Sequence, residues 1–277
     1  MLINEARARE LGNLFGSVGL RGVTAFEDED PQMRSSKTIE AICPGTAATA
    51  LYTNALVSYM LPMKGERYWA LFAEHITRSC PRGWEQLIES VKGFTSSVHR
   101  FGVRQKLNRL DALRRCVRLE NLIRVGDYVG LWHETARCLR TQRDKKTVVF
   151  SVKMAYYGRR AAGHREALPM SIPIPVDRRV ARASILSGVI EGAASIEDLM
   201  RKHRIVARAW GIVAEISGVP PLHLDSVLWV ITSYWEIPSP YKVLRSLPQG
   251  LVEKVGEDLL LVIIKELLFY RRSIRQN

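Results

Sequence analysis

Apolar side chains recur at helical spacing along nearly the whole chain. Val103, Leu107, Leu110 and Val117, for example, mark one face of a predicted helix. The other side of that helix carries the basic residues Arg104, Lys106, Arg109, Arg114, Arg115 and Arg118. We expect this basic side to be solvated, with phosphate contact as the alternative. Alternating strand patterns are scarce and no internal repeat is evident, so the sequence predicts an all-α protein of about a dozen helices.

Helix start signals divide the second half of the chain. Ser195 is followed by acidic residues in the next turn and predicts a helix that runs to Gly218. The pair Pro220-Pro221 predicts the start of another helix. An irregular segment is expected at residues 163–176, and a loop of that length inside a helical protein usually has a function.

The last residues of that irregular segment read SIPIPVD, Ser171 to Asp177. Pro173 and Pro175 fix their own φ and bias the preceding residues toward extended conformations, so we expect a stiff strut without helical structure. The helical pattern resumes after Asp177, which is therefore predicted to cap a helix by accepting hydrogen bonds from free N–H groups. A catalytic carboxylate at Asp177 is the alternative that these residues leave open.

Two predicted helices, VGLWHETARCL and TVVFSVKMAYY, are joined by a short basic turn that leads into Lys146. Together they form a helix, hairpin and helix at about residues 127–161. The second helix is predicted to bury a stripe formed by Val148, Val149, Val152, Ala155 and Tyr156. Lys146 and Phe150 are four residues apart and share a different face of that helix.

Lys146 stands where the positive end of the helix dipole opposes its charge. Arg143 and Lys145 add to this effect. Both influences favour the neutral, nucleophilic amine that Schiff-base chemistry requires. An exposed lysine on a DNA-facing turn is the alternative, so the spacing alone leaves the role of Lys146 open.

The charge balance is the unusual feature of the composition. Forty-one Lys and Arg residues against 28 Asp and Glu give a net charge of +13, while hydrophobic and charged contents of 47% and 25% are ordinary. Such a charge predicts a polyanionic partner, nucleic acid first and an anionic membrane surface second.

No membrane span is expected, because the apolar run Leu259 to Ile264 is short and ends at Lys265. The basic tail, Tyr270 to Arg275, is expected to be solvated.

The cysteines and histidines suggest no metal site. The four cysteines are Cys43, Cys80, Cys116 and Cys138. They are widely spaced without a CxxC pair, so we expect buried free thiols in a reducing cytoplasm. His223 and Asp225 are too few ligands for a metal. Neither a metal nor a cofactor is expected.

Several blocks of sequence together resemble one protein family. KTVVFSVK, LPMSIPIPVDRRVAR and GVPPLHLDSVLW, with the upstream DPQ, NALVSY and KGERYW, are similar in order and spacing to the archaeal 8-oxoguanine DNA glycosylases (AGOG), of the helix-hairpin-helix glycosylase superfamily. The resemblance covers about Phe26 to Trp235. It implies the helix-hairpin-helix DNA glycosylase fold, with two helical subdomains and the active-site cleft between them. One subdomain would combine residues 1–62 with 187–277, and the other would span residues 63–186, with the catalytic loop at 162–177.

The resemblance also implies an activity. Family members are bifunctional: they flip out and excise 8-oxoguanine through a lysine Schiff base and then nick the strand by β-elimination. The catalytic lysine falls on Lys146 and the assisting aspartate on Asp177. The implied partner is double-stranded DNA that contains 8-oxoguanine, with single-stranded DNA as a further candidate. A monomer in the cytoplasm of an archaeal cell, associated with the nucleoid and not with a membrane, would fit this work.

The base pocket carries over residue by residue from the resemblance. Its members are Gln32, Ser58, Trp69, Phe150, Pro175, Asp225 and Trp229. Trp69 and Phe150 are expected to sandwich the flipped base, while Asp225 reads the guanine edge. Gln32 and the Pro175 carbonyl are candidate acceptors for the N7–H that marks oxidised guanine, and the Trp229 indole is a candidate donor to O8.

The turn between the two hairpin helices departs from the wider superfamily. Residues 141–145 lack the usual glycine, which fits the archaeal branch and its atypical hairpin. Arg143, Lys145 and Arg178 are the candidate contacts to the DNA backbone. Two other functions stay open from the sequence: a helix-hairpin-helix glycosylase for another lesion, and a non-catalytic helical protein that binds nucleic acid.

Overall fold

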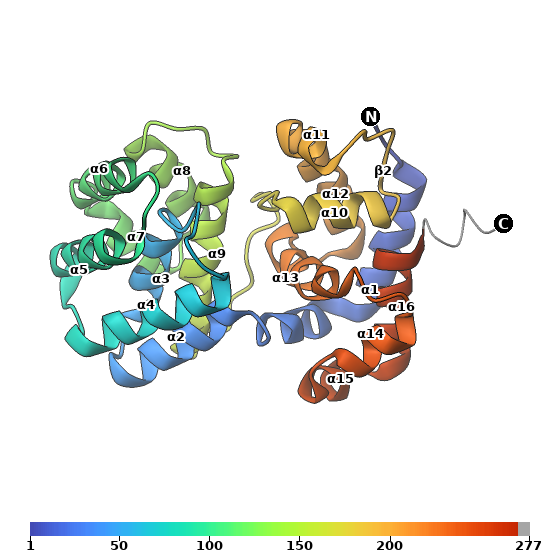
Figure 1. The fold of residues 1–277 in the computed structure, drawn as a ribbon, viewed down its shortest axis with the longest axis horizontal. Helices are drawn as coiled ribbons and strands as arrows, with labels where there is room; N and C mark the ends of the chain where they lie inside the picture. The colour runs from blue at the N-terminus through green and yellow to red at the C-terminus, as the bar shows by residue number, and fades with distance from the viewer. Residues whose placement is uncertain (271–277) are drawn as a thin grey trace. The chain divides into compact units, whose positions relative to one another are not determined.

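Most of the described chain, residues 1–270, is helical in the computed structural model (Figure 1). Within these residues there are two short strands, β1 (Leu2–Ile3) and β2 (Ile190–Glu191). They pair with each other in antiparallel orientation, with Leu2 opposite Glu191. The basic tail beyond Tyr270 lies outside the described residues. The all-α fold class predicted from the sequence is confirmed.

The chain divides into two compact units. Unit 1 combines Met1–Asp30 with Met170–Asn277, and unit 2 is Pro31–Pro169. The boundaries therefore fall near residues 30 and 170, earlier than the positions near 62 and 186 suggested by the resemblance. The physical reason is packing: the helices at residues 31–42 and 47–55 pack on those at residues 65–79 and 146–161, and so belong to unit 2.

Unit 2 is a bundle of eight helices. They are α2 (Pro31–Ile42), α3 (Ala47–Ala55), α4 (Gly65–Ser79), α5 (Gly83–Val98), α6 (Val103–Arg114), α7 (Arg118–Val125), α8 (Tyr128–Cys138) and α9 (Lys146–Ala161). Helix α9 packs against α2, α3 and α8 (Figure 1). The five residues of its predicted stripe are all buried, which confirms that prediction.

The backbones of α3 and α9 approach closely at Gly158. A Cβ atom added at Gly158 would lie 2.1 Å from the Cα of Ala48 and 2.2 Å from its backbone nitrogen. No side chain fits in that space. The glycine therefore permits the contact that holds α9 against α3.

We expect the substitution Gly158→Ala to destabilise the protein by about 3 kcal/mol, because the new methyl group overlaps backbone atoms that cannot rotate away. The matched control is Gly93→Ala in α5, an exposed helical position where an added Cβ meets nothing within 4 Å. That control should be neutral or stabilising by up to about 1 kcal/mol. Urea denaturation measures both, and equal stability of the two variants would contradict this account.

All four cysteines form disulfides, so the predicted free thiols are wrong. Cys43 bonds Cys80 and Cys116 bonds Cys138, across sequence separations of 37 and 22 residues. Cys43 follows α2 and Cys80 ends α4, and because these helices pack together the two Cα atoms lie 5.4 Å apart. Linear spacing hides this proximity. The inference of a reducing compartment, which rested on free thiols, falls with it.

Reduction should therefore weaken unit 2. Loop-closure entropy predicts a loss of about 3–4 kcal/mol for each bond that is removed. The measurement is thermal unfolding with and without a phosphine reductant, on the wild type and on a variant with all four cysteines replaced by serine. The wild type should lose stability in reductant and the variant should not respond. A wild type indifferent to the reductant would contradict the prediction.

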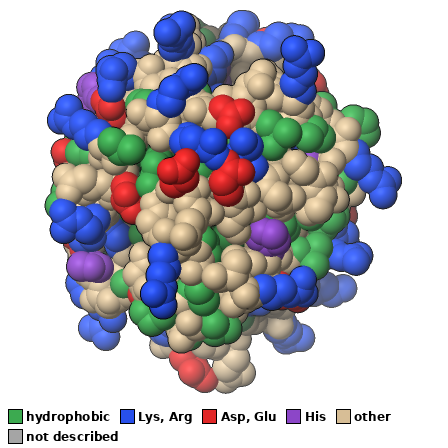
Figure 2. Space-filling model, turned by 90° about the vertical axis from the view of Figure 1, so that its left-hand side faces the viewer, with side chains coloured by type: hydrophobic (Ala, Val, Ile, Leu, Met, Phe, Trp, Pro, Cys, Tyr) green, Lys and Arg blue, Asp and Glu red, His purple; other side chains and the backbone are tan. Residues whose placement is uncertain are grey.

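Charged side chains on α5 and α6 pair with one another. Lys92 lies 2.8 Å from Asp111, and Arg114 pairs with Glu89. The face drawn in Figure 2 shows acidic and basic side chains clustered together, with further basic side chains spread around them. Val117, which the helical pattern assigned to an apolar face, is instead 68% exposed, because α6 ends before it.

Unit 1 contains the remaining helices. They are α1 (Glu5–Glu27), α10 (Arg178–Leu186), α11 (Ile196–Arg201), α12 (His203–Ser217), α13 (Pro221–Ile231), the 3-10 turn η1 (Thr232–Tyr234), α14 (Pro240–Ser246), α15 (Gln249–Val255), α16 (Glu257–Ile264) and the π-helical turn η2 (Lys265–Phe269). The helix start at Ser195 is confirmed, since its hydroxyl accepts from the Asp198 N–H. The helix expected to continue to Gly218 is instead interrupted at Lys202.

The first helix is an integral part of unit 1. It packs along α12, and the buried Arg7 ties it to segments far along the chain. The Arg7 guanidinium donates to the Ser187 carbonyl at 2.7 Å, pairs with Glu266 and lies 3.5 Å from the Tyr270 ring. The N-terminal residues, which carried little of the resemblance, therefore help to close the core of this unit.

Within residues 1–270, no single helix is both long and apolar enough to cross a membrane. One bent pair, α12 with Pro221–Tyr234, meets the length and composition requirement only when its two parts are combined.

Candidate active site

Lys146 is the first residue of α9, and its side chain is exposed. The preceding Lys145 is extended, so the helix begins where the sequence predicted. Phe150, one turn further along the same face, is half-buried. Another turn along that face lies Lys153, which is only 1% exposed and has its ammonium 5.4 Å from the Tyr157 ring. One face of α9 thus carries two lysines with an aromatic ring between them.

The turn before Lys146 contains an unusual backbone conformation. Arg140 has a φ of 48°, in the left-handed region that glycine normally occupies after a helix. The N–H of the next residue, Thr141, donates to the Ala136 carbonyl at 3.0 Å and closes the end of α8. An arginine therefore takes the place of a glycine at this turn.

A tryptophan from α8 supports the same turn. The indole N–H of Trp132 donates to the Arg143 carbonyl at 2.8 Å, and the Arg143 guanidinium lies 5.0 Å from the indole ring. Arg143 and Lys145 are both exposed. The turn thus presents two cations close in sequence to Lys146, and Arg143 among them is held against Trp132.

Trp69 and Phe150 touch each other in unit 2, but not as two parallel plates. Their ring centroids are 6.3 Å apart with an interplanar angle of 68°, an edge-to-face contact. Trp69 is 2% exposed and makes further edge contacts with Tyr68 and Phe72. A base sandwiched between Trp69 and Phe150 would require these rings to turn toward parallel. In the structure Phe150 covers a packed aromatic cluster.

The other two predicted pocket residues of unit 2 lie at helix ends. Ser58 is half-buried just after α3, and its hydroxyl donates to the Ala55 carbonyl at 3.1 Å. Gln32 is the second residue of α2 and is 9% exposed.

In unit 1, Asp177 caps α10 as the sequence predicted. Its Oδ1 accepts from the backbone N–H groups of Arg179 at 2.8 Å and Val180 at 3.0 Å. The approach to it has no helix or strand, which confirms the predicted irregular segment. Ile174 and Val176 are buried in the core of unit 1. These anchors hold the carboxylate at the helix N-terminus.

Asp225 and Trp229 lie one turn apart on α13. Asp225 is 6% exposed and Trp229 is half-buried. Arg179, near the start of α10, donates to the Trp229 carbonyl at 3.0 Å, and its guanidinium lies 3.8 Å from the Trp229 ring. The sequence did not single out Arg179. The predicted backbone contact Arg178 is exposed and pairs with Glu197 at 2.6 Å.

His223, on the same helix, belongs to the core. It is fully buried, and its Nδ1 lies 2.6 Å from a carboxylate oxygen of Glu27. In the part of the chain that the structure describes, no group of three or more His, Cys, Asp or Glu side chains is placed to hold a metal ion.

The structure thus places an exposed lysine at the start of α9 and an aspartate, held by the proline strut, at the start of α10. The AGOG family model, described as N-glycosylase/DNA lyase, matches residues 12–262. The chain belongs to the AGOG family of N-glycosylase/DNA lyases. It is therefore a DNA glycosylase and lyase, a DNA repair enzyme that acts on DNA.

Individual AGOG proteins match most of the chain. The N-glycosylase/DNA lyase of Aeropyrum pernix is 36% identical over 236 residues, which cover 81% of this chain and 82% of that protein. That of Methanopyrus kandleri is 34% identical over 251 residues, covering 87% and 94%. The crystal structure of the 8-oxoguanine DNA glycosylase Pa-AGOG from Pyrobaculum aerophilum, complexed with 8-oxoguanosine, matches with 25% identity and a TM-score of 0.74, covering 91% of this chain and 97% of that one.

The AGOG match reaches further than the sequence blocks that suggested it. Those blocks extended from about Phe26 to Trp235, whereas the family model runs from within α1 to within α16. This agrees with the structure, in which α1 packs against α12 in the core of unit 1. Packing positions of this kind are filled by many apolar residues, so short motifs do not reveal them.

The sequence did not predict a buried chain of hydrogen bonds that runs through Tyr68, one of the aromatic residues packed against Trp69. Lys106, expected on a solvated face, is 0% exposed, and its Nζ lies 2.6 Å from His99 Nδ1. His99 Nε2 lies 3.0 Å from the Tyr68 hydroxyl, which donates to Asn54 Oδ1 at 2.7 Å. An ammonium can only donate, so His99 accepts at Nδ1 and carries its proton on Nε2. The chain of donors then runs in one direction from α6 to α3.

Burial, together with the Lys106 charge, lowers the pKa of His99 from 6.5 to about 4. Burial likewise lowers the pKa of Lys106 from 10.5 to about 8. In both cases the unfolded chain binds a proton more readily than the folded chain does. The free energy of unfolding contributed by these groups therefore rises with pH, by about 1.4 kcal/mol for each unit of pKa difference.

We expect stability to fall as the pH is lowered from 6.5 toward 4 and to rise as it is increased from 8 toward 10.5. The alkaline rise should vanish in Lys106→Met and persist in Lys64→Met, which removes an exposed lysine. Urea denaturation across this pH range gives the measurement. An alkaline rise that survives in Lys106→Met would assign it to another group.

Proposed function

We propose that this AGOG enzyme excises 8-oxoguanine from DNA, with Lys146 as the nucleophile and Asp177 as its assisting carboxylate. The observation that carries the proposal is the placement of Lys146, exposed at the first position of α9 and preceded by a rigid basic turn. The choice of base is supported by the likeness to Pa-AGOG, whose structure holds 8-oxoguanosine.

The reaction follows from the chemistry of an amine at a sugar carbon. The Lys146 amine attacks C1′ of the flipped nucleotide, and the bond to the damaged base breaks. Opening of the sugar ring gives an imine between Lys146 and C1′. The imine acts as an electron sink, so a proton leaves C2′ and the 3′ phosphate departs by β-elimination. Hydrolysis of the remaining imine returns the free lysine.

Asp177 suits the assisting role by its charge and its fixed orientation. Its carboxylate takes the proton that Lys146 loses and stabilises the positive charge that develops on the sugar. Both of its capping hydrogen bonds go to Oδ1, so the cap sets the direction of the carboxylate through one oxygen. The positive end of α10 favours the negative charge. A cap and a catalyst are therefore compatible at this position.

Base recognition is assigned to the remaining pocket residues. Gln32 and the Pro175 carbonyl accept the N7–H that intact guanine lacks, and the Trp229 indole donates to O8. Asp225 pairs with N1–H and the exocyclic amine of any guanine. Ser58, with Trp69 and Phe150, completes the pocket. Stacking on an aromatic ring contributes about 1–3 kcal/mol per base, and Phe150 is the more exposed of the two rings.

Borohydride trapping on a duplex with one 8-oxoguanine tests the nucleophile. The wild type should form a covalent adduct with DNA, because reduction of the imine fixes it. The adduct should disappear in Lys146→Gln and remain in the matched control Lys145→Gln, which removes an exposed lysine from the same turn. An adduct that survives in Lys146→Gln would exclude this role. A wild-type adduct on abasic DNA, with none on the oxidised base, would favour a glycosylase for another lesion.

The substitution Asp177→Asn separates the two roles of that residue. Asparagine is as good an N-cap as aspartate, so the free energy of unfolding should change by less than about 0.5 kcal/mol. The loss of the charge should slow single-turnover excision by about 10²–10⁴-fold. Denaturation and excision are measured on the same preparation. Excision at the wild-type rate would show that Asp177 is a cap only.

Further details belong to the same proposal. Arg143, Lys145 and Arg178 contact the DNA backbone, and each contact adds to the salt dependence of DNA binding. The enzyme works as a monomer on double-stranded DNA, with single-stranded DNA as a second candidate substrate. Because the substrate is the chromosome, we place the enzyme on the nucleoid in the cytoplasm of an archaeal cell.

A further inference from the structure

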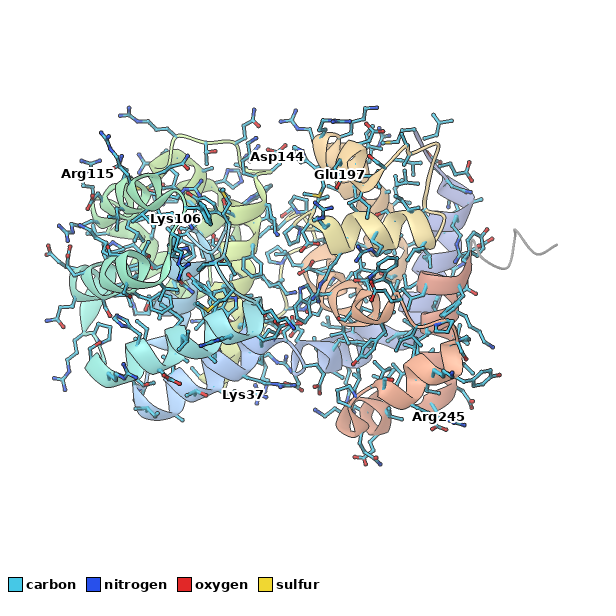
Figure 3. All side chains as sticks on the ribbon, viewed as in Figure 1. Lys37, Lys106, Arg115, Asp144, Glu197 and Arg245 are labelled. Atoms are coloured by element: carbon cyan, nitrogen blue, oxygen red, sulfur yellow. A yellow bond between two sulfur atoms is a disulfide. The ribbon has the colours of Figure 1, made fainter. Side chains whose placement is uncertain are left out.

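Two basic side chains of α6 turn inward and hold the same short segment. The Lys106 ammonium donates to the Tyr59 carbonyl at 2.6 Å, and the Arg109 guanidinium donates to the Leu56 carbonyl at 2.8 Å. Figure 3 shows Lys106 among the helices of unit 2, whereas Arg115, just beyond the end of the same helix, is exposed. A helix face predicted to be solvated thus contributes two buried or half-buried cations.

The segment they hold, residues 56–60, has no regular structure of its own. It follows α3, carries Ser58 at its centre and ends at Met60, which has a left-handed φ of 49°. Leu56 and Tyr59 lie outside a helix, so their carbonyls need donors from elsewhere. Lys106 and Arg109 supply them at the two ends. The Tyr59 ring covers both cations, with its centroid 4.6 Å from Lys106 and 5.8 Å from Arg109.

Arg109 also reaches the helix of the nucleophile. The same nitrogen that donates to the Leu56 carbonyl lies 3.3 Å from the Thr147 hydroxyl. Thr147 directly follows Lys146 in the first turn of α9. One guanidinium therefore touches both the segment that carries Ser58 and the turn that carries the nucleophile.

We propose that Arg109 and Lys106 are positioning residues for base recognition: they fix residues 56–60 so that Ser58 is presented at a set place beside the first turn of α9. This inference rests on the proposed role of Ser58 in the 8-oxoguanine pocket. The lysine is locked by the chain through His99, and the arginine couples the segment to Thr147. A displacement of about 1 Å in such a segment is enough to slow a reaction about 100-fold.

Base excision and cleavage of a preformed abasic site separate this role from a merely structural one. Abasic DNA has no base to recognise, while Lys146 is held by the buried stripe of α9 on α3. Arg109→Gln and Lys106→Met should therefore slow 8-oxoguanine excision about tenfold or more. Abasic-site cleavage should stay within about threefold of the wild type. The control Arg104→Gln removes an exposed charge from α6 and should alter neither rate.

Binding measurements add a second discrimination. The affinity for 8-oxoguanosine should fall in Arg109→Gln, while the affinity for undamaged duplex and its salt dependence stay unchanged. A reduced salt slope in Arg109→Gln would mean that the arginine contacts phosphate, and would overturn the proposal. Equal loss of excision and abasic-site cleavage would make the effect a structural one and would also overturn it.

The failure of the proposed function is distinguishable from the failure of this inference. If the wild type itself neither excises 8-oxoguanine nor binds its nucleoside, the proposed function fails. If the wild type does both and Arg109→Gln and Lys106→Met match it, only the positioning role fails. Thr147→Val removes one acceptor of Arg109. It should slow 8-oxoguanine excision less than Arg109→Gln does, and it should likewise leave abasic-site cleavage unchanged.

Discussion

The contact between α3 and α9 is the constraint on which unit 2 depends. Gly158 has no side chain, so α9 lies directly against the backbone at Ala48. Residues 151–159 of α9 are all buried, so only the N-terminal end of the helix keeps Lys146 exposed and Phe150 half-buried. The place of Lys146, the proposed nucleophile, is thus set by packing along the whole helix, and the basic turn before it needs only to lead the chain into its first residue.

The two proposed catalytic side chains both stand at helix N-termini, where the same dipole acts on opposite charges. It opposes the charge of Lys146 at the start of α9 and favours that of Asp177 at the start of α10. Each unit secures its residue in a different way. Unit 2 uses helix packing, whereas unit 1 uses a proline strut anchored by Ile174 and Val176. A nucleophile and an assisting carboxylate need this difference in charge preference.

Local rules predicted well the features that depend on residues within one helical turn. The cap at Asp177, the start of α9 at Lys146 and its buried stripe all follow from short-range sterics, capping and periodicity. The failures depend on partners far along the chain. Lys106 looked exposed because its acceptor, the Tyr59 carbonyl, lies 47 residues away. The disulfide between Cys43 and Cys80 needs two helices to pack before the sulfurs can meet.

Peptide mapping of the borohydride-reduced adduct tests the central claim most directly. After digestion of the trapped complex, mass spectrometry locates the sugar remnant on a single lysine. Lys145, Lys146 and Lys153 all lie in or beside the first two turns of α9, so the map decides among side chains that differ in exposure and in helix position. The account predicts the remnant on Lys146 alone. A remnant on the exposed Lys145 or the buried Lys153 would contradict it.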